Sequence, residues 1–150
     1  MNILKILKPK ACIEYIYDDY TARQTLEKMK SHGYSAVPVI DREGRFVNTL
    51  SEGDFLRYMM KTGMFDIREM EKCSISEIPA KVKMKPVYVY ATAEDLMMMS
   101  MNQNFVPVID DRNIFIGIVT RKDILEQCAE TLRAYRDKYG PINEEDNEIV

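Results

Sequence analysis

The chain has 150 residues, of which 46% are hydrophobic and 30% are charged, and its formal net charge is −3. This length suits one ordinary domain or two very small domains that share a core, and the composition is typical of a soluble globular protein rather than a disordered one. The slightly negative balance supplies no basic field that would hold a nucleic-acid backbone, so we expect no nucleic-acid partner.

Cysteine and histidine are too few and too scattered for a disulfide framework or a zinc site. The three cysteines are widely spaced, no CxxC motif is present, and His32 is the single histidine. We therefore expect reduced thiols and no bound metal. The first ten residues hold too short an apolar stretch for a signal peptide, and no run approaches the length of a membrane span. These features predict a cytoplasmic protein without membrane attachment.

Apolar periodicity and turn residues predict the elements of the first half of the chain. In chain order they are a strand at 12–17, a helix at 21–31, strands at 36–40 and 45–50, and a helix from Ser51. Gly33 is a typical helix stop, and Gly44 tolerates the positive φ that a tight turn between two strands demands. Ser51 is a favourable N-cap for the closing helix.

The second half repeats this order after a connecting segment at 57–81, in which we expect a short helix at 65–70 and a stop at Pro79. The elements that follow are a strand at 86–90, a helix at 93–102, strands at 105–109 and 114–119, and a helix from Thr120 to Tyr139. Thr92 is a favourable N-cap, and Asn113 occupies the turn position of Gly44. We expect the last helix to end at Gly140 and the acidic tail to be unstructured.

The two halves are related by an internal duplication. Residues 37–56 align with residues 106–125 without a gap at an offset of 69, and eight of the twenty pairs are identical, including both VPVID segments. Most other pairs keep their polarity, for example Ser51 with Thr120. One unit of about 50 residues is too small to bury both faces of its sheet. The sequence therefore predicts an α/β (α+β) fold of tandem β-α-β-β-α repeats packed sheet to sheet.

This duplication resembles the CBS domain pair, also called a Bateman module, over residues 7–130. The likeness rests on Tyr34–Asp41, which reads YSAVPVID, and on Gly117–Asp123, which reads GIVTRKD and matches the family's G-h-h-T/S-x-x-D element. The first repeat departs from that element at Asn48, where the family prefers glycine. The resemblance implies a stand-alone bacterial-type CBS protein with pseudo-twofold symmetry. Its expected parts are a first repeat at 1–62, a linker at 63–81, a second repeat with an extended helix at 82–139 and an acidic tail at 140–150.

CBS pairs commonly bind AMP, ADP, ATP, S-adenosylmethionine or cyclic dinucleotides in two clefts, so the resemblance implies a regulatory adenosine ligand and no required cofactor. The residue chemistry suits such ligands. A hydroxyl and a carboxylate at positions i and i+3 lie on the same helix face. The aspartate can accept both hydrogen bonds of a ribose diol, while the hydroxyl and the N–H groups of the helix start face a phosphate. The strand offers backbone groups to the adenine edge.

In this family the strand of one repeat faces the T/S-x-x-D element of the other, so we expect two clefts of unequal quality. The residues predicted for the main nucleotide site are Tyr34, Ser35, Ala36, Pro38, Thr120, Arg121, Lys122 and Asp123, with residues 10–14 at its mouth. Those predicted for the second cleft are Ser51, Asp54, Asn104, Phe105 and Val106. We expect the second cleft to be weak or empty, because Phe105 stands where Ala36 admits a base and Glu52 would repel a phosphate.

Several alternatives remain open from the sequence. The aspartates of the two T/S-x-x-D elements could be first-turn acids that favour the helix dipole without touching a ligand. Arg121 and Lys122 could be solvated surface residues. The methionines at 97–101 are expected to pack between the repeats or at a dimer face.

The leading hypothesis is a sensor that binds an adenosine nucleotide and signals to a partner protein. Small bacterial CBS proteins that bind cyclic di-AMP are similar in layout, which makes cyclic di-AMP a specific candidate beside AMP, ADP or ATP. The resemblance also implies a homodimer and an unidentified effector protein. The alternative is a ligand-free CBS pair that acts only as a dimeric interaction platform. An enzyme is disfavoured, because the chain has no nucleophile–base arrangement, no P-loop and no GxGxxG after a strand.

Overall fold

The computed structural model describes residues 1–141, and the predicted acidic tail beyond Pro141 lies outside the described residues. The α-helices are α1 (Ala22–His32), α2 (Glu52–Thr62), α3 (Ile67–Lys72), α4 (Ala93–Ser100) and α5 (Arg121–Tyr139). The strands are β1 (Lys8–Pro9), β2 (Ile16–Tyr17), β3 (Ala36–Ile40), β4 (Phe46–Ser51), β5 (Val87–Tyr88), β6 (Phe105–Ile109) and β7 (Phe115–Thr120). Short 3₁₀ turns are η1 (Ile3–Lys5), η2 (Lys10–Cys12) and η3 (Ile75–Glu77).

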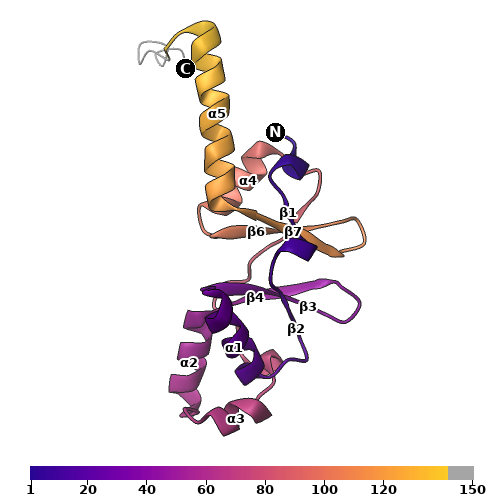
Figure 1. The fold of residues 1–150 in the computed structure, drawn as a ribbon, viewed down its shortest axis with the longest axis vertical. Coiled ribbons are helices and arrows are strands. Elements are labelled where there is room, and N and C mark those ends of the chain that lie inside the picture. The colour runs from indigo at the N-terminus through magenta and orange to yellow at the C-terminus, as the bar shows by residue number, and fades with distance from the viewer. Residues whose placement is uncertain (142–150) are drawn as a thin grey trace.

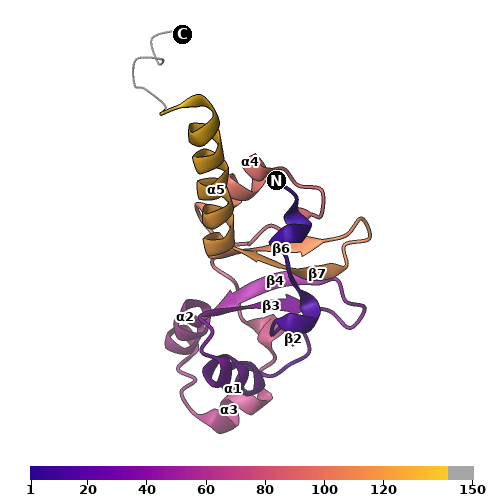
Figure 2. The same ribbon diagram turned by 45° about the horizontal axis from the view of Figure 1, so that its top comes forward.

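Two sheets lie face to face in the middle of the molecule, and the helices lie on their outer sides (Figure 1). One sheet has the order β2-β3-β4 and the other the order β1-β7-β6-β5. In each repeat the hairpin is antiparallel, and the short first strand joins it in parallel. Helices α1, α2 and α3 lie beyond the first sheet, and α4 and α5 lie beyond the second (Figure 2). The predicted fold class, tandem β-α-β-β-α repeats packed sheet to sheet, is confirmed.

Capping residues set the helix starts, and three of them, Ser51, Thr92 and Thr120, are the N-caps that the sequence predicts. The fourth is Thr21, which the sequence places inside the first helix. Each of these four side chains accepts a hydrogen bond from the backbone N–H three residues further on. Gly33 ends α1 in the left-handed conformation, with a φ of 68°, as the sequence predicts. Helix α5 likewise ends at Tyr139 before Gly140. Among residues 1–141, no helix is long and apolar enough to cross a bilayer.

Some elements are shorter than the sequence predicts, and local contacts explain why. The strand expected at 12–17 narrows to β2, because residues 10–12 form the η2 turn instead. The helix expected at 65–70 begins at Ile67, because the Asp66 side chain accepts from the Arg68 N–H and acts as the N-cap. The helix expected at 93–102 is regular only to Ser100, whose carbonyl accepts from the Arg121 side chain at 2.7 Å.

The tips of the two hairpins join the repeats to each other. Gly44 and Asn113 take the positive φ values predicted for them, 86° and 64°. Each of these residues then uses its carbonyl across the interface: the Phe46 N–H donates to Asn113 at 3.3 Å and the Phe115 N–H donates to Gly44 at 2.9 Å. The rings of Phe46 and Phe115 pack between the tips with their centroids 6.2 Å apart. The two hydrogen bonds join equivalent residues of the two repeats, as the pseudo-twofold symmetry requires.

Each repeat is completed by a segment that the repeat pattern alone does not assign to it. The N-terminal strand β1 pairs antiparallel with β7, and Ile3, Ile6 and Leu7 pack in the core of the second repeat. The connecting segment packs instead against the core of the first repeat, through side chains that include Met70, Cys73, Ile75 and Ile78. The division at 1–62, 63–81 and 82–139 follows the repeat in the sequence. The packing differs from it in two places, because the N-terminal residues pack with the second repeat and the connecting segment packs with the first.

Candidate functional site

A cleft between the two repeats joins the segments that the sequence singles out. It has a volume of about 240 Å³ and is lined by Ile13, Glu14, Gly33, Tyr34, Ser35, Ala36, Pro38, Asn104, Phe105, Ile118 and Thr120. The start of β3 thus faces the end of β7, so the YSAVPVID strand of the first repeat meets the T-x-x-D element of the second. Because the cleft brings together residues from both repeats, we call it the inter-repeat cleft.

The carboxylate of the T-x-x-D element beside this cleft, Asp123, uses one of its two oxygens in contacts with the described part of the chain. The Thr120 hydroxyl donates to Oδ2 of Asp123 at 2.5 Å, and the Asp123 N–H donates back to the Thr120 hydroxyl at 3.1 Å. The Lys8 ammonium lies 3.6 Å from the same oxygen. Among the described residues, the other oxygen, Oδ1, accepts no hydrogen bond. The Asp123 side chain is 22% exposed, so the carboxylate is partly accessible to solvent and to a donor such as a ribose hydroxyl.

The matching aspartate of the first repeat is already engaged by its own chain. Oδ2 of Asp54 accepts from the Ser51 N–H and hydroxyl, at 2.8 and 2.9 Å. Oδ1 accepts from the Lys81 N–H at 3.0 Å and from the Arg57 guanidinium at 2.6 Å. Burial by itself would raise the pKa of Asp54, but the hydrogen bonds from Lys81, Ser51 and Arg57 together hold it below its usual value. Asp54 is therefore a structural anion that fastens the connecting segment to α2.

A small charged cluster borders the mouth of the inter-repeat cleft. Glu14 pairs with the Lys28 ammonium at 2.9 Å and lies 3.4 Å from Nε2 of His32. The hydrogen bond from Lys28 is the main cause that lowers the pKa of Glu14. The His32 ring stacks on Tyr34, with centroids 5.8 Å apart and planes 18° from parallel. Tyr34 therefore has a supported face at the cleft, and the predicted segment 10–14 lies at its mouth through Ile13 and Glu14.

The structure gathers most, but not all, of the residues predicted for the main site. Tyr34, Ser35, Ala36, Pro38 and Thr120 line the cleft, and Asp123 is joined to it through Thr120. The two predicted cations are directed elsewhere. The side chain of Arg121 donates to the carbonyl of Ser100, and Lys122 is 81% exposed beside Glu126.

The residues predicted for the second cleft do not form one site. Asn104 and Phe105 border the inter-repeat cleft, and Val106 is fully buried in the core of the second repeat. Asp54 faces a different cavity, of about 450 Å³, beside Arg57 and Lys81. Gly33 and Ile118 also line the inter-repeat cleft, although the sequence analysis did not predict them as site residues. Gly33 directly precedes the Tyr34–Asp41 segment, and Ile118 lies within the Gly117–Asp123 element.

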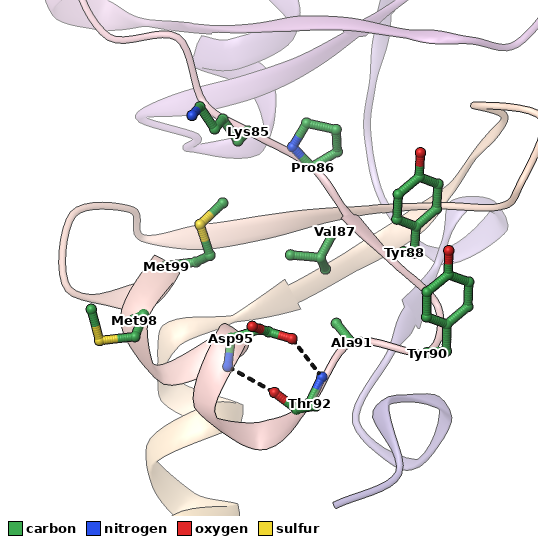
Figure 3. A pocket seen from close by; sticks show the side chains of 10 residues that line it. All are labelled: Lys85, Pro86, Val87, Tyr88, Tyr90, Ala91, Thr92, Asp95, Met98 and Met99. Atoms are coloured by element: carbon green, nitrogen blue, oxygen red, sulfur yellow. Dashed lines mark hydrogen bonds between the residues drawn. The ribbon is translucent and has the colours of Figure 1, made fainter.

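A larger cavity, of about 510 Å³, lies beside β5 and α4 and contains residues of the second repeat only (Figure 3). Its walls include Met98, Met99 and the parallel rings of Tyr88 and Tyr90, whose centroids are 5.2 Å apart. Its carboxylate, Asp95, accepts from the Thr92 N–H at 2.9 Å and so belongs to the helix cap drawn in Figure 3. Because all of its lining residues come from the second repeat, this cavity lacks the facing strand of the other repeat that the inter-repeat cleft has.

The described part of the chain contains no cluster of side chains that could bind a metal ion. Across residues 1–141, no group of three or more histidine, cysteine, aspartate or glutamate side chains is placed to hold an ion. The three cysteines are free thiols, of which Cys73 is buried in the first core. The site therefore offers shape, backbone groups and hydrogen-bond acceptors.

Comparison with known proteins shows the same architecture. A family model described as the CBS domain matches residues 10–61 and 75–130. A crystal structure of CbpB in complex with c-di-AMP is 32% identical, with a match that covers 93% of this chain and 91% of that chain at a TM-score of 0.78. CbpB from Streptococcus agalactiae is 31% identical over 95% of this chain and 92% of that chain, with a TM-score of 0.77.

One curated relative is an enzyme, but the similarity is confined to a small part of it. The inosine-5'-monophosphate dehydrogenase of Methanocaldococcus jannaschii is 27% identical over 125 residues, which span 83% of this chain and 23% of the dehydrogenase. The matched family regions coincide with the two repeats seen in the sequence and in the fold. The chain belongs to the CBS domain family.

Proposed function

We propose that this protein is a regulatory module that binds an adenosine nucleotide in the inter-repeat cleft and signals to a partner protein. The observation that carries the proposal is the meeting of Ser35 and Ala36 with Thr120 around one open space, with Asp123 hydrogen-bonded to Thr120 beside it. Ala36 leaves room for a planar base beside the edge of β3. Oδ1 of Asp123, which has no partner within residues 1–141, supplies the acceptor that a ribose diol requires.

The ligand that the comparisons favour is cyclic di-AMP. CbpB, which is similar over nearly the full length of both chains, has been crystallised with c-di-AMP. The cleft of about 240 Å³ is somewhat smaller than typical sites for drug-sized ligands. We infer that one adenosine unit enters the cleft and that the rest of a dinucleotide extends through its mouth past Glu14 and Tyr34.

Titration calorimetry with cyclic di-AMP, AMP, ADP and ATP tests whether an adenosine nucleotide binds and whether cyclic di-AMP is preferred. The expected result is saturable binding with one site per chain, with cyclic di-AMP the tightest. Binding of a mononucleotide alone would keep the adenosine site and overturn the preference for the dinucleotide. If none of the four compounds bound at sub-millimolar concentration, the sensor function would be wrong and a ligand-free interaction platform would take its place.

Replacement of Asp123 is the most direct test of the proposed contact with the ribose. Asp123→Ala should weaken the best ligand by about 10- to 150-fold, because hydrogen bonds to a charged group are each worth about 1.5–3 kcal/mol. Asp95→Ala is the matched control, since it removes the aspartate of a T-x-x-D element at the start of α4 that does not border the cleft. Equal affinities of the two variants would contradict the assigned role of Asp123.

A second variant tests the base pocket rather than the sugar contact. Ala36→Phe puts at the start of β3 the side chain that stands at the start of β6, Phe105. Because both positions border the cleft, the added ring should fill the space that we assign to adenine and abolish binding. Unchanged affinity of this variant, with a native melting temperature, would place the base elsewhere.

A further inference from the structure

His32 contacts two residues of the inter-repeat cleft from outside it. Glu14 and Tyr34 line the cleft, whereas His32 does not. Nε2 of His32 lies 3.4 Å from Oε1 of Glu14, and its ring stacks on the Tyr34 ring with planes 18° apart. Glu14 precedes β2 and Tyr34 precedes β3, so the histidine connects two separate segments of the cleft mouth.

The end of α1 determines where this histidine lies. His32 is the last residue of α1, and Gly33 follows it in the left-handed conformation with a φ of 68°. This turn brings the Tyr34 N–H to the carbonyl of Met29, at a distance of 3.0 Å. The helix cap therefore fixes the backbone of the cleft wall, and the stack with His32 orients the Tyr34 side chain.

The second repeat ends its equivalent helix without a histidine. At the offset of 69 that aligns the two VPVID strands, His32 corresponds to Met101 and Tyr34 corresponds to Gln103. Gln103 is buried, and its side chain donates to the carbonyl of Phe105 at 3.4 Å. The fold of a repeat therefore does not require the imidazole, whose contacts are particular to the mouth of the inter-repeat cleft.

The groups beside His32 differ in the pH range over which they change charge. The Lys28 ammonium lies 2.9 Å from Oε2 of Glu14, so each oxygen of this carboxylate has one basic neighbour. The hydrogen bond from Lys28 lowers the pKa of Glu14, which is therefore an anion from mildly acidic pH upward. Lysine and tyrosine side chains ordinarily titrate well above neutral pH. Imidazole is the side-chain group that ordinarily changes its charge between about pH 5 and 8.

We propose that His32 is a positioning residue whose protonated form strengthens nucleotide binding in the inter-repeat cleft. This role rests on the adenosine site proposed above. An imidazolium forms an ion pair with Glu14 and places a cation beside the face of Tyr34, and both interactions hold the mouth in one arrangement. It also adds positive charge beside the path that we assign to the outer half of a dinucleotide. The affinity should therefore rise as the pH falls from about 8 to about 5.5.

Calorimetry with cyclic di-AMP over this pH range tests the role of His32. The two phosphodiesters of this probe keep their charge throughout, whereas the phosphate monoester of AMP ionises at about pH 6. Wild-type affinity should increase about two- to fivefold at the acid end, as expected for a partly exposed ion pair. His32→Gln keeps a polar side chain that gains no proton, so its affinity should stay constant. Lys30→Gln removes another cation from the last turn of α1, and this matched control should keep the wild-type pH dependence.

The outcomes separate this role from the proposed function. The same gain in affinity for His32→Gln as for the wild type would refute the role of His32 and leave the adenosine site intact. Failure of cyclic di-AMP to bind at any pH would refute this role together with the proposed ligand.

Proton NMR gives a second readout, because His32 is the single histidine of the chain. With any affinity tag removed, its imidazole resonance should titrate at higher pH in the complex with cyclic di-AMP than in the free protein. The reason is that a proton that strengthens ligand binding is itself held more tightly when the ligand is bound. An identical titration in the two states would overturn the assignment.

Discussion

Replacement of Asp54 is the change whose consequence follows most directly from the structure. Its two carboxylate oxygens accept four hydrogen bonds, from the Ser51 N–H and hydroxyl, the Arg57 guanidinium and the Lys81 N–H. The side chain is only 6% exposed. Asp54→Ala therefore leaves donors of both α2 and the connecting segment without their acceptor in a place that water reaches poorly.

The expected cost is about 1–3 kcal/mol of unfolding free energy, the range for polar groups left without a hydrogen-bond partner, because the remaining charge on Arg57 is on a side chain that is 50% exposed and can be hydrated. For a chain of this size, each kcal/mol corresponds to a fall of about 2–4 °C in the melting temperature. The assay is urea unfolding of the wild type and of Asp54→Ala, followed by circular dichroism. Asp95→Ala is the control, because it removes a helix-capping carboxylate that is exposed. If the two variants unfolded at the same urea concentration, the connecting segment would not depend on Asp54.

The pH dependence of the unfolding free energy gives a second test of the contacts of Asp54, and its direction follows from the pKa of that residue. The pKa of Asp54 is lowered in the folded protein, so folding favours the charged form. Its contribution is therefore fully present above the unfolded pKa of about 3.9 and is lost as pH falls through the lower, folded value. Between neutral pH and that acid range, the gap in unfolding free energy between wild type and Asp54→Ala should narrow. A gap that stayed constant into the acid range would contradict the assigned ionisation.

Two further substitutions test other contacts in the fold. Thr49→Val should raise the unfolding free energy by about 1–3 kcal/mol in urea melts, because the buried Thr49 hydroxyl finds no hydrogen-bond partner within residues 1–141 and valine keeps the shape without the polar group. A loss of stability would show that the hydroxyl is satisfied in solution. Gly117→Ala should detach β1 from β7, since a Cβ at Gly117 would come 2.2 Å from the carbonyl oxygen of Lys8; the readout is faster amide exchange in both strands, and unchanged protection there would refute the close approach.

The sequence by itself determined the order of the elements and the pairing of the two halves. Hairpin turns, helix caps and helix stops depend on residues within four positions of one another, which is why Gly44, Asn113, Ser51 and Thr120 could be assigned their roles directly. The duplication then implied that two equivalent sheets share one interface, because neither repeat can bury its sheet alone. The T/S-x-x-D spacing also sufficed to place a hydroxyl and a carboxylate on one helix face.

Only the tertiary structure decided which of the two aspartates is available. Asp54 and Asp123 occupy equivalent positions in equivalent motifs, and the sequence ranks their clefts by Phe105 and Glu52 but does not show which carboxylate its own chain engages. Asp54 accepts from the nearby Arg57 and also from the amide of Lys81, which is 27 residues away, whereas within residues 1–141 Asp123 has Thr120 and Lys8 beside it. The pairing of β1 with β7 and the hydrogen bond from the Arg121 side chain to the Ser100 carbonyl also join residues that are far apart in the sequence. Such contacts join segments that the chain brings together only on folding, so the local sequence records the motif and the tertiary packing determines its use.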